Sequence, residues 1–431
     1  MKKIVCDFTK TVGTLRPQHG LCNFPVSTAI SEFSPAIEDS LHAKKLLSEL
    51  HPTVIRLKDH KHIGYGKGLE VPYIFRDFSK DPDDPANYYF YCTHSVVEGA
   101  RETGADVLYR LGAPREYWKP RFNQKPADCK KWADVCLHII RHLNEGWADG
   151  KHYGIRYWEI WNRADDPQCW VGSYEDYYEL YAATATAIKK EFPDLLVGGP
   201  AIADCGGDCA FLQGFLDHVK KNGLPCDFVS WNFYGTDAAE GLKQAKKVKK
   251  LVEAAKLPGR VQIICDEWNC MTLDENGRYA DSHVRDAYGA AFDAAFLMAM
   301  EQAGMDFCTY YDCELAVPWG GFVQRNWIKA YKPPYAFWAY NRLYELGEKA
   351  AVTVSGKNLT ALAAQKDGKK AILAAVCQTR RDTVEIDTGA AGKKTVYVLD
   401  GKRDLEKVLT TRNKTVTVPT EGHSVLYIEI E

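Results

Sequence analysis

The sequence predicts an α/β protein, namely a (β/α)₈ TIM barrel with an accessory antiparallel β-sandwich. Short apolar runs alternate with amphipathic helical stretches along most of the chain, and eight such repeats are typical of this barrel. No GxGxxG motif follows the first predicted strand, which argues against an open dinucleotide-binding sheet. After about Leu346, short alternating segments typical of antiparallel strands take over. We therefore expect the barrel at 13–345 and the sandwich at 1–12 plus 346–431.

The predicted barrel strands are runs of β-branched and aromatic residues bounded by polar breaks. In chain order they are 20–24, 53–57, 106–111, 156–161, 195–199, 227–231, 261–266 and 306–311. Apolar residues at helical spacing predict helices over 37–50, 89–103, 126–145, 174–191, 209–222, 239–255 and 282–303. The glycine-rich segment 64–68 lacks the spacing of a phosphate-binding loop, so we interpret it as a loop after the second strand.

The predicted sandwich contains segments such as KKAILAAVC and SVLYIEI, separated by Lys-Asp-Gly, Gly and Asn turns. The N-terminal KKIVCDF segment fits a further strand of the same module, which would place both ends of the chain together. No low-complexity linker precedes this module, so we expect a firm interface with the barrel.

Composition and charge limit the classes of partner. The formal net charge is −2 and the chain has no long basic run, which argues against a nucleic-acid or anionic-membrane partner. A short apolar run before Asp7 and the lack of a long apolar stretch predict neither a signal peptide nor a membrane span. With fourteen cysteines, this favours a reducing cytoplasm with free thiols. Cys205 and Cys209 lack the doubled CxxC pattern of structural zinc sites, so most cysteines are interpreted as core residues. A homo-oligomer is compatible with the sequence, which does not define the oligomeric state.

Three predicted strands end in unusual polar sequences. They are WEIWNR at 158–163, SWNFYG at 230–235 and CDEWN at 265–269. In a (β/α)₈ barrel, the C-terminal strand ends line the functional face. A carboxylate there, flanked by Trp and Asn, suits attack on an anomeric carbon: aromatic faces pack on a sugar and the amide holds a hydroxyl.

These motifs make the chain resemble the retaining glycosidases of clan A, and most closely family 39, which includes β-xylosidases and α-iduronidases. The resemblance extends through the stretch 155–203, the segment KPPYAFWAYNRL after the eighth strand, and the closing β module. It implies that Glu267 is the catalytic nucleophile and that Asn162 hydrogen-bonds the sugar 2-hydroxyl. It also implies that Arg56 lies beneath the −1 site and that Tyr234 lies beside the nucleophile.

The sequence departs from the family pattern at four positions. The family's acid/base glutamate follows the asparagine in Asn-Glu-Pro, whereas this chain has Arg163 and Ala164 there. Lys58 and Asn232 replace two family histidines, and we expect both, with His60 and Glu314, among the residues that bind the substrate. Arginine stays protonated near neutral pH, so Arg163 can neither donate a proton nor act as a base.

Another group would therefore have to serve as the acid. Asp165 and Asp166 are close in sequence, and Asp312 or Glu314 at the end of the eighth strand are further candidates. Arg56, Lys58 and Arg163 would also give the pocket several cations, which suits a carboxylated or sulfated sugar.

Other residues have two interpretations. His60 and His62, with Asp59, suggest a metal site, but a hydrogen-bonded loop cluster is favoured. Trp268 and Trp319 fit either sugar platforms or core packing. Glu159 is interpreted as a buried barrel carboxylate rather than a catalyst.

The leading functional prediction is a cytoplasmic glycoside hydrolase that acts with retention through Glu267 on oligosaccharides or glycoconjugates. Its carbohydrate substrate is the expected partner, and its chemistry needs no metal or organic cofactor. The alternative is a catalytically silent carbohydrate-binding barrel. A third hypothesis is an enzyme whose aglycone leaves without protonation.

Overall fold

The chain folds into a closed eight-stranded barrel and a separate nine-stranded sheet, which confirms the predicted fold class. The computed structural model describes residues 2–25, 44–59, 68–115, 121–203, 205–271, 283–313, 320–324 and 329–431. Neighbouring barrel strands are parallel, and the ring closes where β2 pairs with β9. The strands are β2 (Gly20–Cys22), β3 (Val54–Leu57), β4 (Asp106–Leu111), β5 (Tyr157–Ile160), β6 (Leu196–Ile202), β7 (Phe228–Gly235), β8 (Gln262–Cys270) and β9 (Phe307–Tyr310).

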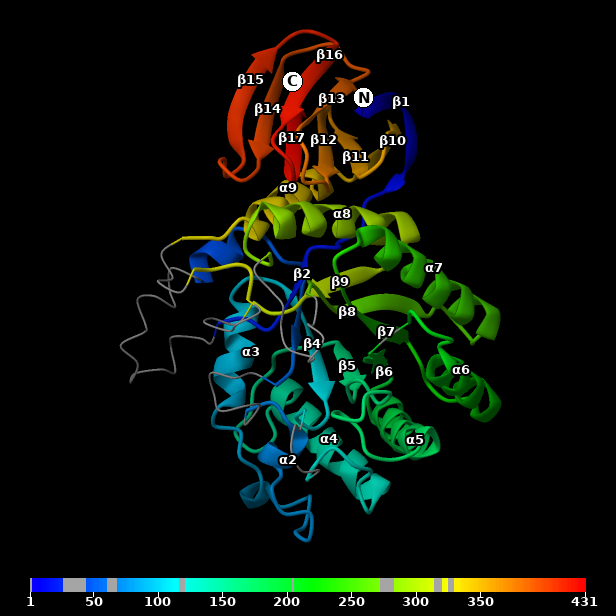
Figure 1. The fold of residues 1–431 in the computed structure, drawn as a ribbon. Coiled ribbons are helices and arrows are strands. Elements are labelled where there is room, and N and C mark those ends of the chain that lie inside the picture. The colour runs from blue at the N-terminus through cyan, green and yellow to red at the C-terminus, as the bar shows by residue number, and fades with distance from the viewer. Residues whose placement is uncertain are drawn as a thin grey trace.

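Helices surround the barrel, as Figure 1 shows. They are α2 (Val71–Ile74), the 3₁₀ helix η1 (Pro85–Asn87), α3 (Thr93–Arg101), α4 (Cys129–Asn144), α5 (Tyr174–Glu191), α6 (Ala210–Asn222), α7 (Ala238–Ala255), α8 (Ala287–Ala303) and α9 (Pro333–Tyr344). Side-chain caps explain several starts: Ser173 and Asp176 form a capping box on α5, and Asp286 caps α8. No described helix is both long and apolar enough to cross a membrane.

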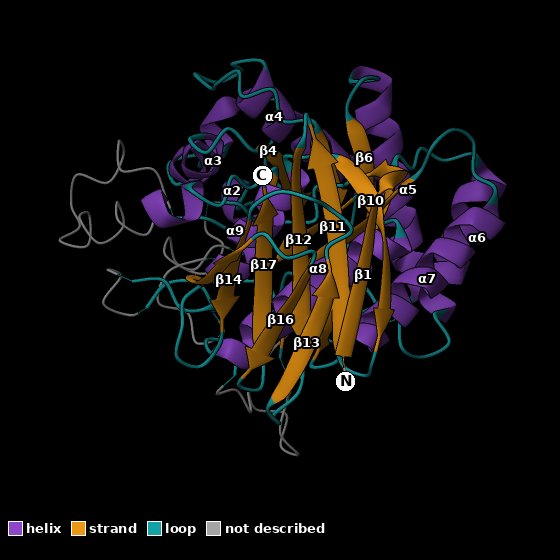
Figure 2. Cartoon of the chain, turned by 90° about the horizontal axis from the view of Figure 1, so that it is seen from above, coloured by secondary structure: helices purple, strands orange, loops and turns teal. Residues whose placement is uncertain are grey.

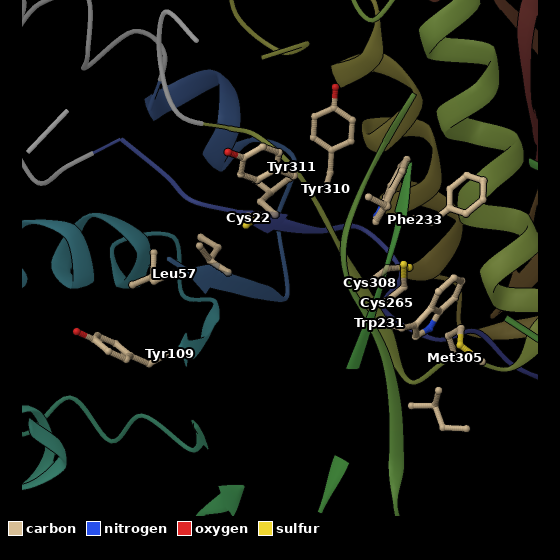
Figure 3. Close-up of a cluster of buried hydrophobic side chains, with 14 of the residues drawn as sticks. Cys22, Leu57, Tyr109, Trp231, Phe233, Cys265, Met305, Cys308, Tyr310 and Tyr311 are labelled. Carbon is tan, nitrogen blue, oxygen red and sulfur yellow. The ribbon is translucent and has the colours of Figure 1, made fainter. Parts of the chain in front are cut away.

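One end of the barrel is closed by a layer of large side chains. Six strands contribute Val54, Leu108, Tyr157, Phe228, Ile264 and Phe307 to this layer, all of them buried. These residues lie near the starts of their strands, so the polar residues further along each strand lie toward the C-terminal ends. Figure 3 shows further buried side chains, with Cys22 and Tyr311 at neighbouring strands. The packing therefore leaves the C-terminal end of the barrel for a functional site.

The accessory sheet contains the predicted C-terminal strands together with the first segment of the chain. Its order is β15-β14-β17-β12-β11-β10-β1-β13-β16. The strands are β1 (Lys2–Thr14), β10 (Glu348–Ser355), β11 (Leu359–Lys366), β12 (Lys369–Val376), β13 (Asp382–Asp387), β14 (Lys394–Leu399), β15 (Glu406–Thr411), β16 (Thr415–Thr420) and β17 (Ser424–Ile430). The sheet is not wholly antiparallel, because β1 runs parallel to β13.

The accessory sheet has a separate core on one face and covers the barrel helices with the other. Its own core contains Ile4 of β1, Ile372 of β12 and Val416 of β16, as expected when a sheet curls around a sandwich-like interior. The opposite face, with Leu373 and Tyr427, belongs to the barrel's hydrophobic cluster. Figure 2, seen from above, shows this sheet lying over α8.

Glu301 of α8 fixes the junction between the two parts. Its side chain is buried and accepts hydrogen bonds from the Arg16 backbone N–H at 2.8 Å and from Lys349 Nζ at 2.7 Å. Arg16 follows β1, where the chain leaves the sheet for the barrel, and Lys349 lies in β10, where the chain returns to the sheet. One carboxylate on a barrel helix therefore contacts both connections between the two parts. α8 itself is buried on almost every side, which explains its alanine-rich sequence.

Candidate active site

Four side chains predicted from the sequence meet at the C-terminal end of the barrel. Arg56 lies on β3, Tyr234 on β7 and Glu267 on β8, while Asn162 follows β5. Glu267 Oε2 lies 2.9 Å from Arg56 Nη1, and Arg56 Nη2 donates to Asn162 Oδ1 at 2.8 Å. Tyr234 donates its hydroxyl to the other carboxylate oxygen, Glu267 Oε1. The structure therefore brings these four residues together.

Lys58 adds a second cation to Glu267. Its Nζ lies 2.6 Å from Glu267 Oε2 and 3.5 Å from Asp59 Oδ2, and it also lies 4.7 Å from the centre of the Tyr311 ring. Lys58 reaches the same side of the barrel as Arg56 because residues two apart along a strand point the same way. Oε2 of Glu267 is thus held by two cations, and Oε1 by one hydroxyl.

A β-bulge on β8 lets two consecutive carboxyl groups reach Arg56. Trp231 pairs with Cys265 and Asn232 pairs with Glu267, so Asp266 is the extra residue on β8. Asp266 Oδ2 lies 2.8 Å from Arg56 Nη2 although regular alternation would send Asp266 and Glu267 to opposite faces. Arg56 also donates from Nε to Glu159 Oε2 at 2.8 Å. The guanidinium therefore contacts three buried carboxyl groups.

The protonated form of Asp266 is favoured in the folded protein. The two cations Arg56 and Lys58 face the three carboxyl groups of Glu159, Asp266 and Glu267, all of them buried. Burial raises the pKa of Asp266 well above its ordinary value; Arg56 opposes this, and the charge of Glu159 and the hydrogen bond with it reinforce it. Asn232, predicted to bind substrate, donates to Asp266 Oδ1 at 3.0 Å and is itself buried. The carboxyl groups of Asp266 and Glu159 both contact the guanidinium of Arg56 and hold it in position.

Replacing Asp266 with asparagine tests whether Asp266 is protonated in the folded protein. The native protein holds a proton that unfolded Asp266 releases near pH 4, so this group lowers the unfolding free energy as pH rises toward its folded pKa. Asp266→Asn supplies a permanent N–H and removes that dependence. The variant should gain about 1.4 kcal/mol on the wild type per pH unit within that window. Urea unfolding at pH 5 and pH 8 measures the difference. If the unfolding free energies of the two proteins change equally with pH, Asp266 is not protonated in the folded protein.

The electrostatics keep Glu267 ionised. Burial raises its pKa, but Lys58, Arg56 and Arg163 together outweigh burial and hold the pKa well below the ordinary value of a glutamate. Burial lowers the pKa of Lys58, but the negative charges of Asp59 and Glu267 outweigh burial and raise that pKa above the ordinary value of a lysine. At neutral pH the pocket therefore contains a carboxylate and an ammonium rather than a neutral pair.

Lys58→Met should move the acid side of the pH profile. Removal of a cation 2.6 Å from Glu267 raises the pKa of that carboxyl. As the pH falls, Glu267 of the variant therefore becomes protonated at a less acidic pH than in the wild type. The wild type should keep its kcat/KM on an activated aryl glycoside down to the lowest pH at which it stays folded. The variant should lose activity progressively below about pH 5. Lys243→Met, on the exposed face of α7, is the control and should follow the wild type.

Arg163 lies beside the same pocket. Its backbone N–H donates to Ala201 O at 3.0 Å, and the residue has a φ of 54°, in the left-handed region. The guanidinium carbon lies 5.7 Å from the centre of the Tyr234 ring, whose hydroxyl contacts Glu267. Burial lowers the pKa of Arg163, but the charge of Glu267 contributes most to a net rise. Arg163 is therefore a fixed cation next to Glu267.

The two aspartates that follow Arg163 already have partners. Asp165 accepts the Ala203 backbone N–H with both oxygens, at 2.8 and 3.0 Å. Asp166 Oδ2 lies 3.4 Å from Arg163 Nη2 and 3.5 Å from Arg115 Nη2. Asp165 thus stabilises the loop after β6, and Asp166 is the nearer of the two to Arg163.

The tryptophans that flank the strand motifs belong to the core. Trp268 is fully buried, with its ring stacked on Phe296 at 4.4 Å and on Phe337 at 5.9 Å, so it does not line the pocket. Trp161 is also buried and donates to Cys169 O. Past the bulge, alternation along β8 points Trp268 toward α8 when Glu267 points into the barrel. The packing interpretation of Trp268 is therefore the one that fits.

Sequence reasoning missed Tyr311, Glu70 and Arg110. The ring of Tyr311 follows β9 and lies 6.5 Å from that of Tyr234, centre to centre. Glu70 pairs with Arg110 and accepts the Asp59 backbone N–H at 2.9 Å; burial and the charge of Asp59 raise its pKa to about 7. The positions of Tyr311 and Arg110 at strand ends were the available signal.

Some predicted residues cannot be placed. His60, Glu314 and Trp319 lie outside the described residues. Within the described ranges, no group of three His, Cys, Asp or Glu side chains is arranged to hold a metal ion.

Comparison with known proteins shows that about half of the chain is similar in sequence to glycosidases. Residues 108–317 match the family model of glycosyl hydrolases family 39. A β-xylosidase from Caldicellulosiruptor saccharolyticus is 30% identical over 217 residues, which is 44% of this chain and 42% of the relative. A β-xylosidase from Geobacillus stearothermophilus is 28% identical over 215 residues, or 44% of this chain and 39% of the relative. The aligned parts therefore span about two fifths of these curated relatives.

Solved structures resemble the whole chain. A glucosidase from Croceicoccus marinus has a TM-score of 0.79 with 23% identity, covering 99% of this chain and 98% of that one. A GH39 β-xylosidase from Caulobacter crescentus has a TM-score of 0.72 with 20% identity, covering 100% of both chains. These likenesses show a shared fold. The part of the chain that is similar to the glycosyl hydrolases of family 39, residues 108–317, contains strands β5 to β9 and Glu267.

Proposed function

We propose that this protein is a retaining glycoside hydrolase in which Glu267 is the nucleophile. The observation that carries the proposal is a buried carboxylate that is kept ionised by Arg56 and Lys58 at the C-terminal end of a barrel. Oε2 is held by both cations, which leaves Oε1, with only the Tyr234 hydroxyl, to attack the anomeric carbon. The substrate is an oligosaccharide or glycoconjugate, and the names of the curated relatives make β-xylosides the first substrates to test.

In the proposed first step, Glu267 Oε1 bonds to the anomeric carbon as the glycosidic bond breaks. Asn162 lies within reach of the same sugar, since its Oδ1 is held by Arg56 at 2.8 Å and its amide N–H groups can donate to a hydroxyl. Water then attacks the glycosyl-enzyme and restores the carboxylate. Two inversions give net retention of configuration.

An alternative function is carbohydrate binding without catalysis. Both oxygens of Glu267 already have partners, so a locked carboxylate would favour this alternative. The deciding experiment uses a 2-deoxy-2-fluoro glycoside with a dinitrophenolate leaving group, which departs without acid help. Intact-mass and peptide analysis should find one added glycosyl group on Glu267. Sugar binding without any adduct, across xylosides, glucosides and uronides, would support the silent binding protein.

The ion pairs of the pocket limit which cation could bind a negative group of an anionic sugar. Arg56 and Lys58 are both within ion-pair distance of carboxylates of this chain, at 2.5–3.5 Å. We infer that Arg163 is the cation with donors to spare, because the one ion pair described for it is the 3.4 Å contact with Asp166. A negative group on the substrate would therefore face Arg163 rather than the floor of the pocket.

A further inference from the structure

Arg163 has unused hydrogen-bond donors inside the site. Its side chain is 16% exposed, and Nε is buried without a hydrogen-bond partner in the described part of the chain. A guanidinium has five N–H donors, and the one ion pair of Arg163 within the described residues uses Nη2, so the partly exposed side chain keeps donors for a ligand acceptor. Arg163 lies over the ring of Tyr234, whose hydroxyl contacts the attacking oxygen of Glu267, so its donors are close to the reacting bond.

An arginine beside a breaking C–O bond favours a particular kind of leaving group. A guanidinium cannot give a proton to the leaving oxygen, but it stabilises a negative charge that develops there through charge-assisted hydrogen bonds. It is most useful when the leaving oxygen stays negative after departure. The oxygens of acidic phenols, carboxylic acids and phosphates meet this requirement, whereas an alcohol or a second sugar does not.

We propose that this protein cleaves glycosides whose leaving group departs as an oxyanion, such as aryl, acyl or phosphoryl glycosides, and that Arg163 receives that oxyanion. This inference rests on the proposed function, in which Glu267 is the nucleophile. In this proposal, arginine at the position of the family's acid does not abolish catalysis, because Arg163 stabilises the leaving oxygen instead of protonating it.

The proposed steps balance without a carboxylic acid. Glu267 Oε1 donates an electron pair to the anomeric carbon, and the electrons of the broken C–O bond stay on the leaving oxygen. The negative charge thereby moves from Glu267 to an oxygen at Arg163, and no proton is transferred. The leaving group departs as an anion. Water next attacks the anomeric carbon, the ester bond to Glu267 breaks with its electrons returning to the carboxylate, and the proton lost by the attacking water passes to the solvent.

The contacts of the neighbouring carboxylates are consistent with this assignment. Asp165 is engaged with the Ala203 backbone, and Asp166 lies between Arg163 and Arg115. Both aspartates are therefore held by groups of this chain, and Arg163 is the residue at the position of the family's acid.

The test compares leaving groups in the wild type, in Arg163→Glu and in Arg163→Met. The substrates are aryl β-xylosides with phenol pKa values from about 4 to 10, together with methyl xyloside and xylobiose. In the wild type, kcat/KM should fall steeply as the leaving-group pKa rises, with no detectable cleavage of xylobiose. Arg163→Glu should flatten this dependence and raise xylobiose cleavage on the order of 10²-fold or more, because a carboxylic acid now protonates the leaving oxygen. Arg163→Met should slow the activated substrates on the order of 10²–10³-fold and gain nothing on xylobiose.

Two results would overturn the inference and a third would overturn more. A flat leaving-group dependence in the wild type, with ready cleavage of xylobiose, would show that a carboxylic acid is at work. Unchanged aryl-xyloside rates in Arg163→Met would exclude oxyanion stabilisation. Failure of the wild type and of both variants to form a glycosyl-enzyme would instead refute the proposed function itself. Arg115→Met, on the other side of Asp166, is the matched control and should match the wild type. Urea unfolding confirms that each variant is folded, and Arg163→Gln replaces Arg163→Met if that variant is not.

Discussion

Arg56→Met is expected to lower the unfolding free energy by about 3–5 kcal/mol, the largest stability loss of any single substitution in the site. Arg56 is fully buried and contacts Glu159, Asp266, Glu267 and Asn162. Methionine fills much of the volume but leaves buried carboxyl groups without their main cation. Urea denaturation at pH 7 measures the loss.

A surface arginine gives the matched control for this prediction. Arg156 pairs with Asp106, and their side chains are 58% and 45% exposed. Arg156→Met should change the unfolding free energy by no more than about 1 kcal/mol. If Arg56→Met is as mild as this control, the buried cluster does not depend on Arg56 for its charge balance. Acidification should narrow the gap between Arg56→Met and the wild type, because protonated carboxyl groups no longer need a cation.

Glu267→Ala is expected to reduce kcat/KM on dinitrophenyl xyloside by a factor on the order of 10⁴–10⁶, because the attacking carboxylate is removed. Azide should restore part of the rate by occupying the space of the lost side chain, and the product should be a glycosyl azide of inverted configuration. Chromatography and mass spectrometry of the products measure both effects.

Structural damage has to be separated from chemical damage in that experiment. Glu267→Gln keeps the shape of the side chain and can still accept from Arg56 and Lys58, so it should fold and bind substrate while remaining inactive. If Glu267→Ala keeps more than about a tenth of the wild-type rate, another group is the nucleophile. If azide accelerates the wild type but not Glu267→Ala, that result also counts against Glu267 as the nucleophile.

The barrel was predictable because its strands are buried on both faces. Parallel strands of this kind appear as short, continuous apolar runs, and each of the eight predicted runs overlaps one strand of the barrel. The ends were less predictable. β7 and β8 extend to Gly235 and Cys270, beyond the predicted 231 and 266, since their polar ends are paired in the barrel instead of exposed.

The site was predictable where motif and strand end coincide, as for Glu267, Asn162 and Arg56. It was not predictable where the backbone is irregular. One extra residue in β8 directs Asp266 and Glu267 to the same guanidinium, and nothing in the letters DEWN specifies that bulge. For Trp268 the sequence left both a sugar platform and core packing open, because it does not show which face of the strand the side chain takes.

The position of β1 has a consequence for the time course of synthesis. This strand lies between β10 and β13, yet roughly 330 residues separate Thr14 from Glu348, where β10 begins (Figure 1). A ribosome adding about 5–20 residues per second needs roughly 20–70 s to supply the first of these neighbours. During that interval the apolar side chains of Ile4, Cys6 and Phe8 have no sheet to enter. A nascent chain is therefore expected to expose the apolar side chains of β1 while its barrel is already folding, and to bind ribosome-associated chaperones until the later strands of the sheet emerge.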